Sequence, residues 1–465
     1  MLKTTGILKR QFKPLKTYNR CICYPPSFSH YLKNQPATRY SKLYNGVTIA
    51  TAERDSCAAC VGLFIDAGSR YESKQENGSA HFFEHIAFKS TNKRNKQCLL
   101  EHMESLGSRF KSIVTRELVA FYVECLSQDV PLATDVLVDC VFNNALDMAE
   151  IENQKKVIYS EMLEHDKDPG AVVMDYLYAS AFQGTPLAQS VMGPSSNLYH
   201  FSGPSIGRYL SKCFDPCRTV LAAAGGVSHE QMTSLANCFL GGLEPIKCLD
   251  VSAHRYTGSE VRYRDDTMPA AHVIVAVEAP CLSDDERVAM EVARLVLGGW
   301  DRSQPAGEAH PSRVAREASS GLCDSYHTFN IAYKDCGLFG VHYVSDVMHL
   351  DDMMLLIQDE FMYLSLCVTE SEVEKAKNIL TTKILRKMDS PEGTCKDIGK
   401  WTLYHGCRPE LAAQLHAVAR VTAQHVRAAC YRYLYDKCPV VTAVGPTEGL
   451  LPYTRTRSYM WWLRT

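Results

Sequence analysis

The chain of 465 residues contains no apolar run close to the roughly 18 residues that a membrane span requires. Any membrane association is therefore expected to be peripheral. The net charge is only −2, which gives no support for bulk binding of nucleic acid. A disulfide pattern is missing too, because the 19 cysteines are scattered and odd in number. They indicate free thiols in a reducing compartment.

Acidic residues are absent from the start of the chain, where Glu53 is the first one. Lysines and arginines, interspersed with serines and threonines, occupy the same stretch. This composition is typical of a mitochondrial transit peptide, which we predict over residues 1–37, with the mature protein in the mitochondrial matrix. A disordered basic arm is the alternative.

One stretch, residues 77–88, carries the candidate chemistry. Asn77 or Ser79 can cap a helix there. On that helix His81, Glu84 and His85 share one face, because residues three and four apart are neighbours. Two imidazoles one turn apart can hold a divalent metal, usually zinc, and the carboxylate beside them can act as a general base. The order His-x-x-Glu-His is the inverzincin arrangement; the alternative is a helix with two hydrogen-bonded histidines and an exposed glutamate.

A zinc ion held by two histidines needs a third protein ligand and an open position for water. Residues 148–165 predict a helix on which Glu161 follows Val157 and Ile158 by one turn. A carboxylate on that apolar stripe is unfavourable to bury unpaired, and a bound metal would neutralise it. We therefore predict Glu161 as the third ligand and Glu164 as the second choice, the alternative being an exposed Glu161 at a helix edge.

The length of the chain favours two domains of about 200 residues each. The layout of the first half starts again in the second, where residues 271–279 echo the apolar strand of residues 58–67. Residues 284–297 then take the place of the metal helix, without its His and Glu cluster. This indicates a weak internal duplication. We predict an α+β fold of two similar sheet-and-helix domains, over residues 38–245 and 256–465, with a metal only in the first.

Smaller expectations concern single elements. We expect the first strand at residues 43–49, entered through an Asn45-Gly46 turn, and an exposed loop at residues 304–320. The C-terminal part is expected to be helical over residues 350–388 and 412–434.

Longer runs carry a family resemblance. HFFEHIAFKST (residues 81–91), the helix leading to Glu161 and the long C-terminal stretch resemble the pitrilysin family of zinc metallopeptidases. The diagnostic runs include AFQGTPLAQSVMGP (181–194), VLAAAGGVSHEQ (220–231) and YTGSEVRYRDDTMPAAH (256–272). The similarity extends from about Thr38 to Thr465, nearly all of the mature chain.

The resemblance implies one Zn²⁺ per chain, with His81, His85 and Glu161 as ligands and Glu84 as general base. Tyr333 matches a second-domain tyrosine that contacts substrate, with structural packing as the alternative. Within the family the chain is similar to beta-type processing peptidase subunits and to core proteins of respiratory complex III. The expected partners are an alpha-type peptidase subunit or a second core protein, other complex III subunits, and basic presequence peptides as substrate.

Two departures from the family pattern leave the function open. Gln154 stands where the family usually has a second acidic residue supporting the site, so metal affinity or turnover could fall. Residues 111–117 read Lys-Ser-Ile-Val-Thr-Arg-Glu in place of Asn-Ala-Tyr-Thr-Ser-Arg-Glu, and Lys111 is expected to repel a basic presequence. The first hypothesis is a zinc metalloendopeptidase that removes mitochondrial presequences. The second is a structural core subunit on the matrix side of the inner membrane, with weak or no peptidase activity.

Overall fold

The computed structural model describes residues 36–245, 254–305 and 310–462. The predicted transit peptide therefore lies almost wholly outside the described residues. Within them no helix is both long and apolar enough for a membrane crossing, and all cysteines are free thiols, as expected.

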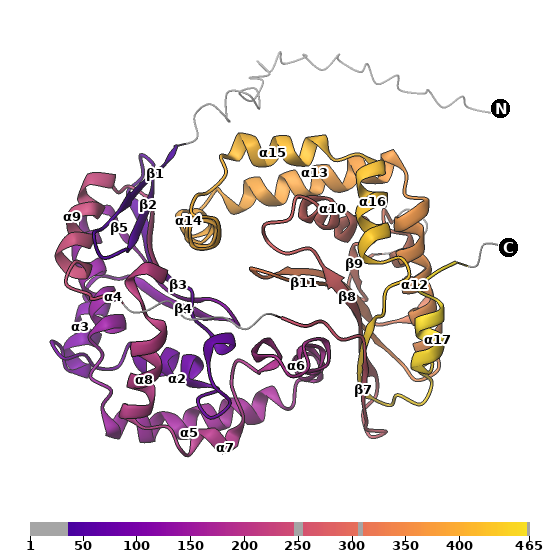
Figure 1. The fold of residues 1–465 in the computed structure, drawn as a ribbon, viewed down its shortest axis with the longest axis horizontal. Helices are drawn as coiled ribbons and strands as arrows, with labels where there is room; N and C mark the ends of the chain where they lie inside the picture. Colours follow the sequence, from indigo (N-terminus) through magenta and orange to yellow (C-terminus); the bar gives the residue numbers. More distant parts are fainter. Residues whose placement is uncertain (1–35, 246–253, 306–309, 463–465) are drawn as a thin grey trace, which may run out of the picture. The chain divides into compact units, whose positions relative to one another are not determined.

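The first half of the chain forms one six-stranded sheet (Figure 1). Its spatial order is β1–β2–β6–β3–β5–β4, with β1 (Thr38–Lys42), β2 (Thr48–Glu53), β3 (Ala58–Ile65), β4 (Arg109–Val114), β5 (Val119–Leu126) and β6 (Thr219–Gly225). Only the β2–β6 pair is parallel. The expected Asn45-Gly46 turn is present, with Gly46 at φ 102°, but the strand expected at residues 43–49 begins only at Thr48, after that turn. That backbone conformation favours glycine.

The second half repeats this arrangement. The order is β7–β12–β8–β11–β10–β9, with β7 (Glu260–Arg264), β8 (Ala271–Ala279), β9 (Gly299–Asp301), β10 (Ser325–Ala332), β11 (Gly337–Ser345) and β12 (Val440–Gly445). The β7–β12 pair is parallel and its other neighbours antiparallel, as for β2–β6 in the first sheet. The predicted α+β fold with an internal duplication is confirmed.

Helices complete each half. The first half contains α2 (Ser79–Ala87), α3 (Lys96–Ser105), α4 (Val130–Phe142), α5 (Met148–His165), α6 (Pro169–Ala181), α7 (Ser195–Leu198), α8 (Gly203–Cys213) and α9 (His229–Leu240). The second contains α10 (Arg287–Leu297), α11 (Arg313–Glu317), α12 (Leu350–Leu366), α13 (Glu370–Lys387), α14 (Pro391–His405), α15 (Leu411–Arg420), α16 (Ala423–Tyr433) and α17 (Tyr453–Ser458). Short helical turns are η1 (Ser69–Tyr71), η2 (Ser127–Asp129), η3 (Pro186–Ala188), η4 (Pro216–Arg218) and η5 (Ala318–Leu322).

The C-terminal helical expectations are confirmed by α12, α13, α15 and α16. The exposed loop expected at residues 304–320 is wrong in its second part, where α11 and η5 form and Val314, Ala315 and Ala318 are fully buried. These small apolar side chains join the core of the second half. The sequence did not indicate this burial, because Pro305, Gly307 and Pro311 nearby are typical of a loop.

Two helices cross between the halves. Helix α6 packs on strands β12 and β8 of the second sheet, while α14 packs on β6, β3 and β2 of the first (Figure 1). Val173 and Leu177 of α6 share a buried cluster with Ile274, and Ile398 of α14 shares one with Phe64. The chain from residue 36 onward accordingly forms one compact unit, and its division at residues 245–256 stays a prediction.

Candidate metal centre

Helix α2 begins differently from the sequence expectation. Its N-cap is Gly78 at φ 101°, and no cap side chain binds the helix. Instead the Glu72 carboxylate accepts hydrogen bonds from the backbone N–H of Gly78 (2.8 Å) and Ala80 (2.7 Å) and from Asn77 Nδ2 (3.0 Å). Glu72 is buried, and burial raises the pKa of its carboxyl to about 7 although these donors oppose the shift. A carboxylate from outside the helix thus satisfies its first N–H groups, a role that Asn77 or Ser79 was expected to fill.

The apolar side of α2 fixes the helix against the sheet. Phe82, Phe83 and Ile86 are buried, and the Phe83 ring makes edge contacts with Phe121 of β5 and with Phe214. Such aromatic contacts add to the stabilisation from burial alone. This packing of the apolar side fixes the direction in which the two histidines on the other side of α2 point.

That face meets α5. Glu161 Oε2 lies 2.9 Å from His85 Nε2 and 3.5 Å from His81 Nε2. The two imidazole centroids are 4.8 Å apart. The nearest ligand atoms of all three residues lie within 4.8 Å of one another, so the structure brings together the three side chains that the sequence singled out.

The residues present fit a metal. His81 is buried, and its Nε2 has no hydrogen-bond partner in the described structure, although it points toward the Glu161 carboxylate. A buried polar atom without a partner is rare unless a ligand completes it. Two imidazole nitrogens and one carboxylate oxygen are the donor set of catalytic zinc sites with an open fourth position.

Glu84 lies beside this cluster, with its Oε2 3.7 Å from His81 Nδ1. Burial opposes ionisation of Glu84, but contacts with His81 and with Ser112 of β4 outweigh it, so the pKa of Glu84 is lowered. Burial, followed by the neighbouring His81, lowers the pKa of His85. A zinc ion held here would supply Lewis acidity. Glu84 is placed to take a proton at one of its carboxylate oxygens and return it.

The remaining candidates occupy different places. Gln154 is buried on α5, two turns before Glu161, and Glu164, the second choice for the third ligand, is exposed. Tyr333 is buried in the second half, where its hydroxyl donates to Tyr178 at 2.8 Å. This position matches the packing alternative, and a substrate contact by Tyr333 stays a prediction.

Among the described strands, β4 forms the edge of the first sheet beside α2. Its side chains alternate: Ser112 contacts Glu84, whereas Lys111 turns to the other face and pairs with Glu392 of α14 at 2.9 Å. Glu124 lies 3.6 Å from the same ammonium. The Lys111 charge is offset by these carboxylates, of which Glu392 also pairs with Lys396, and the repulsion of a basic peptide by Lys111 stays a prediction.

Comparison with known proteins identifies the family. Residues 47–195 match the family model described as Insulinase (Peptidase family M16), and residues 201–380 match the Peptidase M16 inactive domain. The chain belongs to the M16 peptidase family, which confirms the pitrilysin resemblance.

Within that family two groups of relatives stand out. The chain is 42% identical over 443 residues to Cytochrome b-c1 complex subunit 1, mitochondrial, of Bos taurus, covering 94% of this chain and 92% of the relative. It is 40% identical over 437 residues to Mitochondrial-processing peptidase subunit beta of the same species, covering 92% and 89%. A solved structure titled Complex III2 from Candida albicans, Inz-5 bound, has the same fold, with a TM-score of 0.83 at 24% identity over 92% of this chain and 100% of that one.

Proposed function

We propose that this protein is a core subunit of the mitochondrial cytochrome b-c1 complex, respiratory complex III. The observation that carries the proposal is the full-length similarity to subunit 1 of that complex at 42% identity. In this role the chain lies on the matrix side of the inner membrane, beside a second, non-identical core protein. It requires no membrane-crossing helix of its own, in keeping with the described residues.

The test is purification of the tagged protein from mitochondria, followed by identification of what travels with it. Other b-c1 subunits are expected, in near-equal amounts. Recovery of an alpha-type processing peptidase subunit alone would overturn the core role.

A second function is favoured by the site itself. The convergence of His81, His85 and Glu161, with Glu84 beside them, supports a zinc metalloendopeptidase of the beta type that cleaves N-terminal presequences. The outer edge of β4, which pairs with no other described strand, supports it further, because an extended peptide can add to such an edge through its backbone. Such a peptide would lie next to Glu84, which Ser112 of β4 contacts.

Cleavage of a presequence peptide by the purified complex, or by the chain paired with an alpha-type subunit, tests this second function. Glu84→Gln should abolish cleavage while zinc stays bound, because the amide cannot accept the proton. Glu164→Gln, at an exposed position on α5, should leave cleavage unchanged. Absence of cleavage by the unmodified protein would leave only the structural role.

A further inference from the structure

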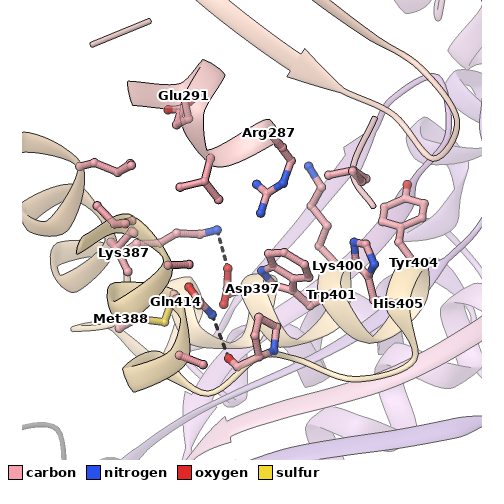
Figure 2. Close-up of a pocket in the computed structure, with 18 residues that line it drawn as sticks. Arg287, Glu291, Lys387, Met388, Asp397, Lys400, Trp401, Tyr404, His405 and Gln414 are labelled. Atoms are coloured by element: carbon pink, nitrogen blue, oxygen red, sulfur yellow. Dashed lines mark hydrogen bonds and ion pairs between the residues drawn. The ribbon is translucent and has the colours of Figure 1, made fainter. Parts of the chain in front are cut away.

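A cavity of about 410 Å³ lies among α10, α13, α14 and α15, and its lining does not include the candidate metal ligands (Figure 2). Its floor is the face of α14 opposite to the one that packs on the first sheet. Aliphatic side chains form much of the remaining wall, among them Val288 of α10, Ile384 of α13 and Val418 of α15. A cavity of this composition is suited to an apolar body with a few polar anchoring groups.

Cationic groups converge in the same space. The side chains of Arg287 and Lys400 extend toward each other beside Trp401 and His405 (Figure 2). The Arg287 guanidinium lies 5.0 Å from the Trp401 ring centre, and neither cation has a hydrogen bond or ion pair among the described residues. His405 Nε2 is buried, and it too has no hydrogen-bond partner in the described structure. Partial burial lowers the pKa of Arg287 although Glu291 and Asp397 oppose this.

The acidic residues of the cavity are already engaged. Asp397 pairs with Lys387 at 2.9 Å and with Arg408 at 2.8 Å. The Glu291 carboxylate accepts a hydrogen bond from Arg294 Nε at 3.0 Å. Two like charges that face one cavity repel each other, and an anion between them would remove the repulsion.

We propose that this cavity binds a single-chain amphiphile with an anionic head, its carboxylate or phosphate held by Arg287, Lys400 and His405 and its alkyl chain lying against the aliphatic wall. A bare anion would leave the aliphatic wall in water, and an uncharged chain would leave the cations without a counter-charge. A divalent metal or a basic peptide is excluded by the sign of the charge. Fatty carboxylates and alkyl phosphates share the required chemistry.

The test is calorimetric titration of the full-length protein with dodecanoate and with dodecyl phosphate, both below their micelle concentrations. Dodecanol tests the alkyl chain without a charged head, and inorganic phosphate tests the charged head without a chain. At least one of the two amphiphiles should bind, and the stronger of them identifies the head group. The stronger amphiphile should bind at least about tenfold more tightly than dodecanol or inorganic phosphate.

Variants locate the site. Lys400→Gln and Arg287→Gln should each weaken binding by about tenfold. Lys375→Gln, an exposed lysine of α13 outside the cavity, should bind as the unmodified protein does. Lys400 is exposed, so its variant decides the matter even if Arg287→Gln fails to fold. No binding of either amphiphile, equal binding of dodecanol, equal binding of inorganic phosphate, or undiminished binding by Lys400→Gln would overturn the proposal.

Discussion

At the scale of single residues, the candidate metal centre depends on one carboxylate, Glu161, that α5 contributes to the two histidines of α2. Glu161 is the group that His81 and His85 share, at 3.5 and 2.9 Å. Three protein ligands leave a fourth position open for water. If only two of these candidate ligands remained, a zinc ion would be held less tightly.

Glu161→Gln should weaken zinc binding by at least about 100-fold, beyond the range seen when only supporting residues are changed. Zinc per chain, measured by mass spectrometry after dialysis against a weak chelator, checks this. Glu164→Gln is the matched control, because it removes an exposed carboxylate one turn further along α5. Equal zinc in the two variants would contradict the assignment of Glu161.

A second feature at this scale is a buried carboxyl outside the candidate metal centre. Glu360 of α12 is 2% exposed, and burial raises its pKa from 4.5 to about 7 although Arg313, 3.7 Å away, opposes the shift. The folded protein therefore holds this proton at pH values where the unfolded chain has released it. Its contribution to stability is complete below pH 4.5 and is lost as the pH rises toward 7.

Glu360→Gln should remove this dependence. Between pH 5 and 8 the unmodified protein should lose up to about 3 kcal/mol relative to the variant, measured as the difference in unfolding free energy by denaturant titration. Glu104→Gln, at an exposed position on α3, should follow the unmodified protein throughout. If the unfolding free energies of Glu360→Gln and the unmodified protein changed in parallel with pH, titration of the buried Glu360 carboxyl would be refuted.

At the scale of elements, α14 is the helix that joins the second half to the first sheet. Gly399 allows the close approach, because a Cβ there would clash with the Phe64 ring of β3. Ile398 and Cys395 of the same helix are buried in the shared cluster. The contact of α14 with the sheet thus requires glycine at this position.

Gly399→Ala should lower the unfolding free energy by about 1–3 kcal/mol, the usual effect of overpacking a core. Combining it with Phe64→Leu should recover part of the loss, because the smaller side chain leaves room. Gly242→Ala is the control, since a Cβ there has nothing within 4 Å. Denaturant midpoints of the four proteins measure the effect, and equal losses at Gly399 and Gly242 would contradict it.

At the scale of the whole molecule, an ion cluster links the two halves. Arg70 of η1 pairs with Glu117 of the first half and, at 2.5 Å, with Asp335 of the second. Glu117 also accepts a hydrogen bond from the Lys334 backbone N–H at 3.1 Å. Burial opposes ionisation of Asp335, but Arg70 and His254 outweigh it and lower its pKa to about 2. Removing one of these buried charges would leave the charge of its partner uncompensated.

Arg70→Met should reduce stability by about 3–5 kcal/mol, because it leaves the buried Glu117 carboxylate without its partner. Adding Glu117→Gln should restore part of that loss, and the four proteins of this double-mutant cycle give the coupling energy. Arg302→Met removes an exposed pair with Asp324 and should change stability by less than about 1 kcal/mol. Strictly additive effects of Arg70→Met and Glu117→Gln on the unfolding free energy would refute the coupling.

Much of the candidate site could be predicted from the sequence, because helical spacing places His81, Glu84 and His85 on one face whatever surrounds the helix. The strands at residues 58–65 and 271–279 were equally predictable from their apolar runs. Glu72 was not, because nothing in its local sequence indicates that its carboxylate would bind the start of α2. Helix α14 was missed as well, since its buried side chains face a sheet from the other half.

The sequence by itself determined the family, the repeated α+β layout and the identity of the metal-ligand candidates, because these depend on local periodicity and long matching runs. Only the tertiary structure decided that Glu161 reaches both histidines, that Lys111 is offset by Glu392 and that Arg287 and Lys400 face one cavity. The physical reason is that each of these contacts joins residues far apart in the chain. Their distances are set by how helices pack on sheets, which local spacing does not specify.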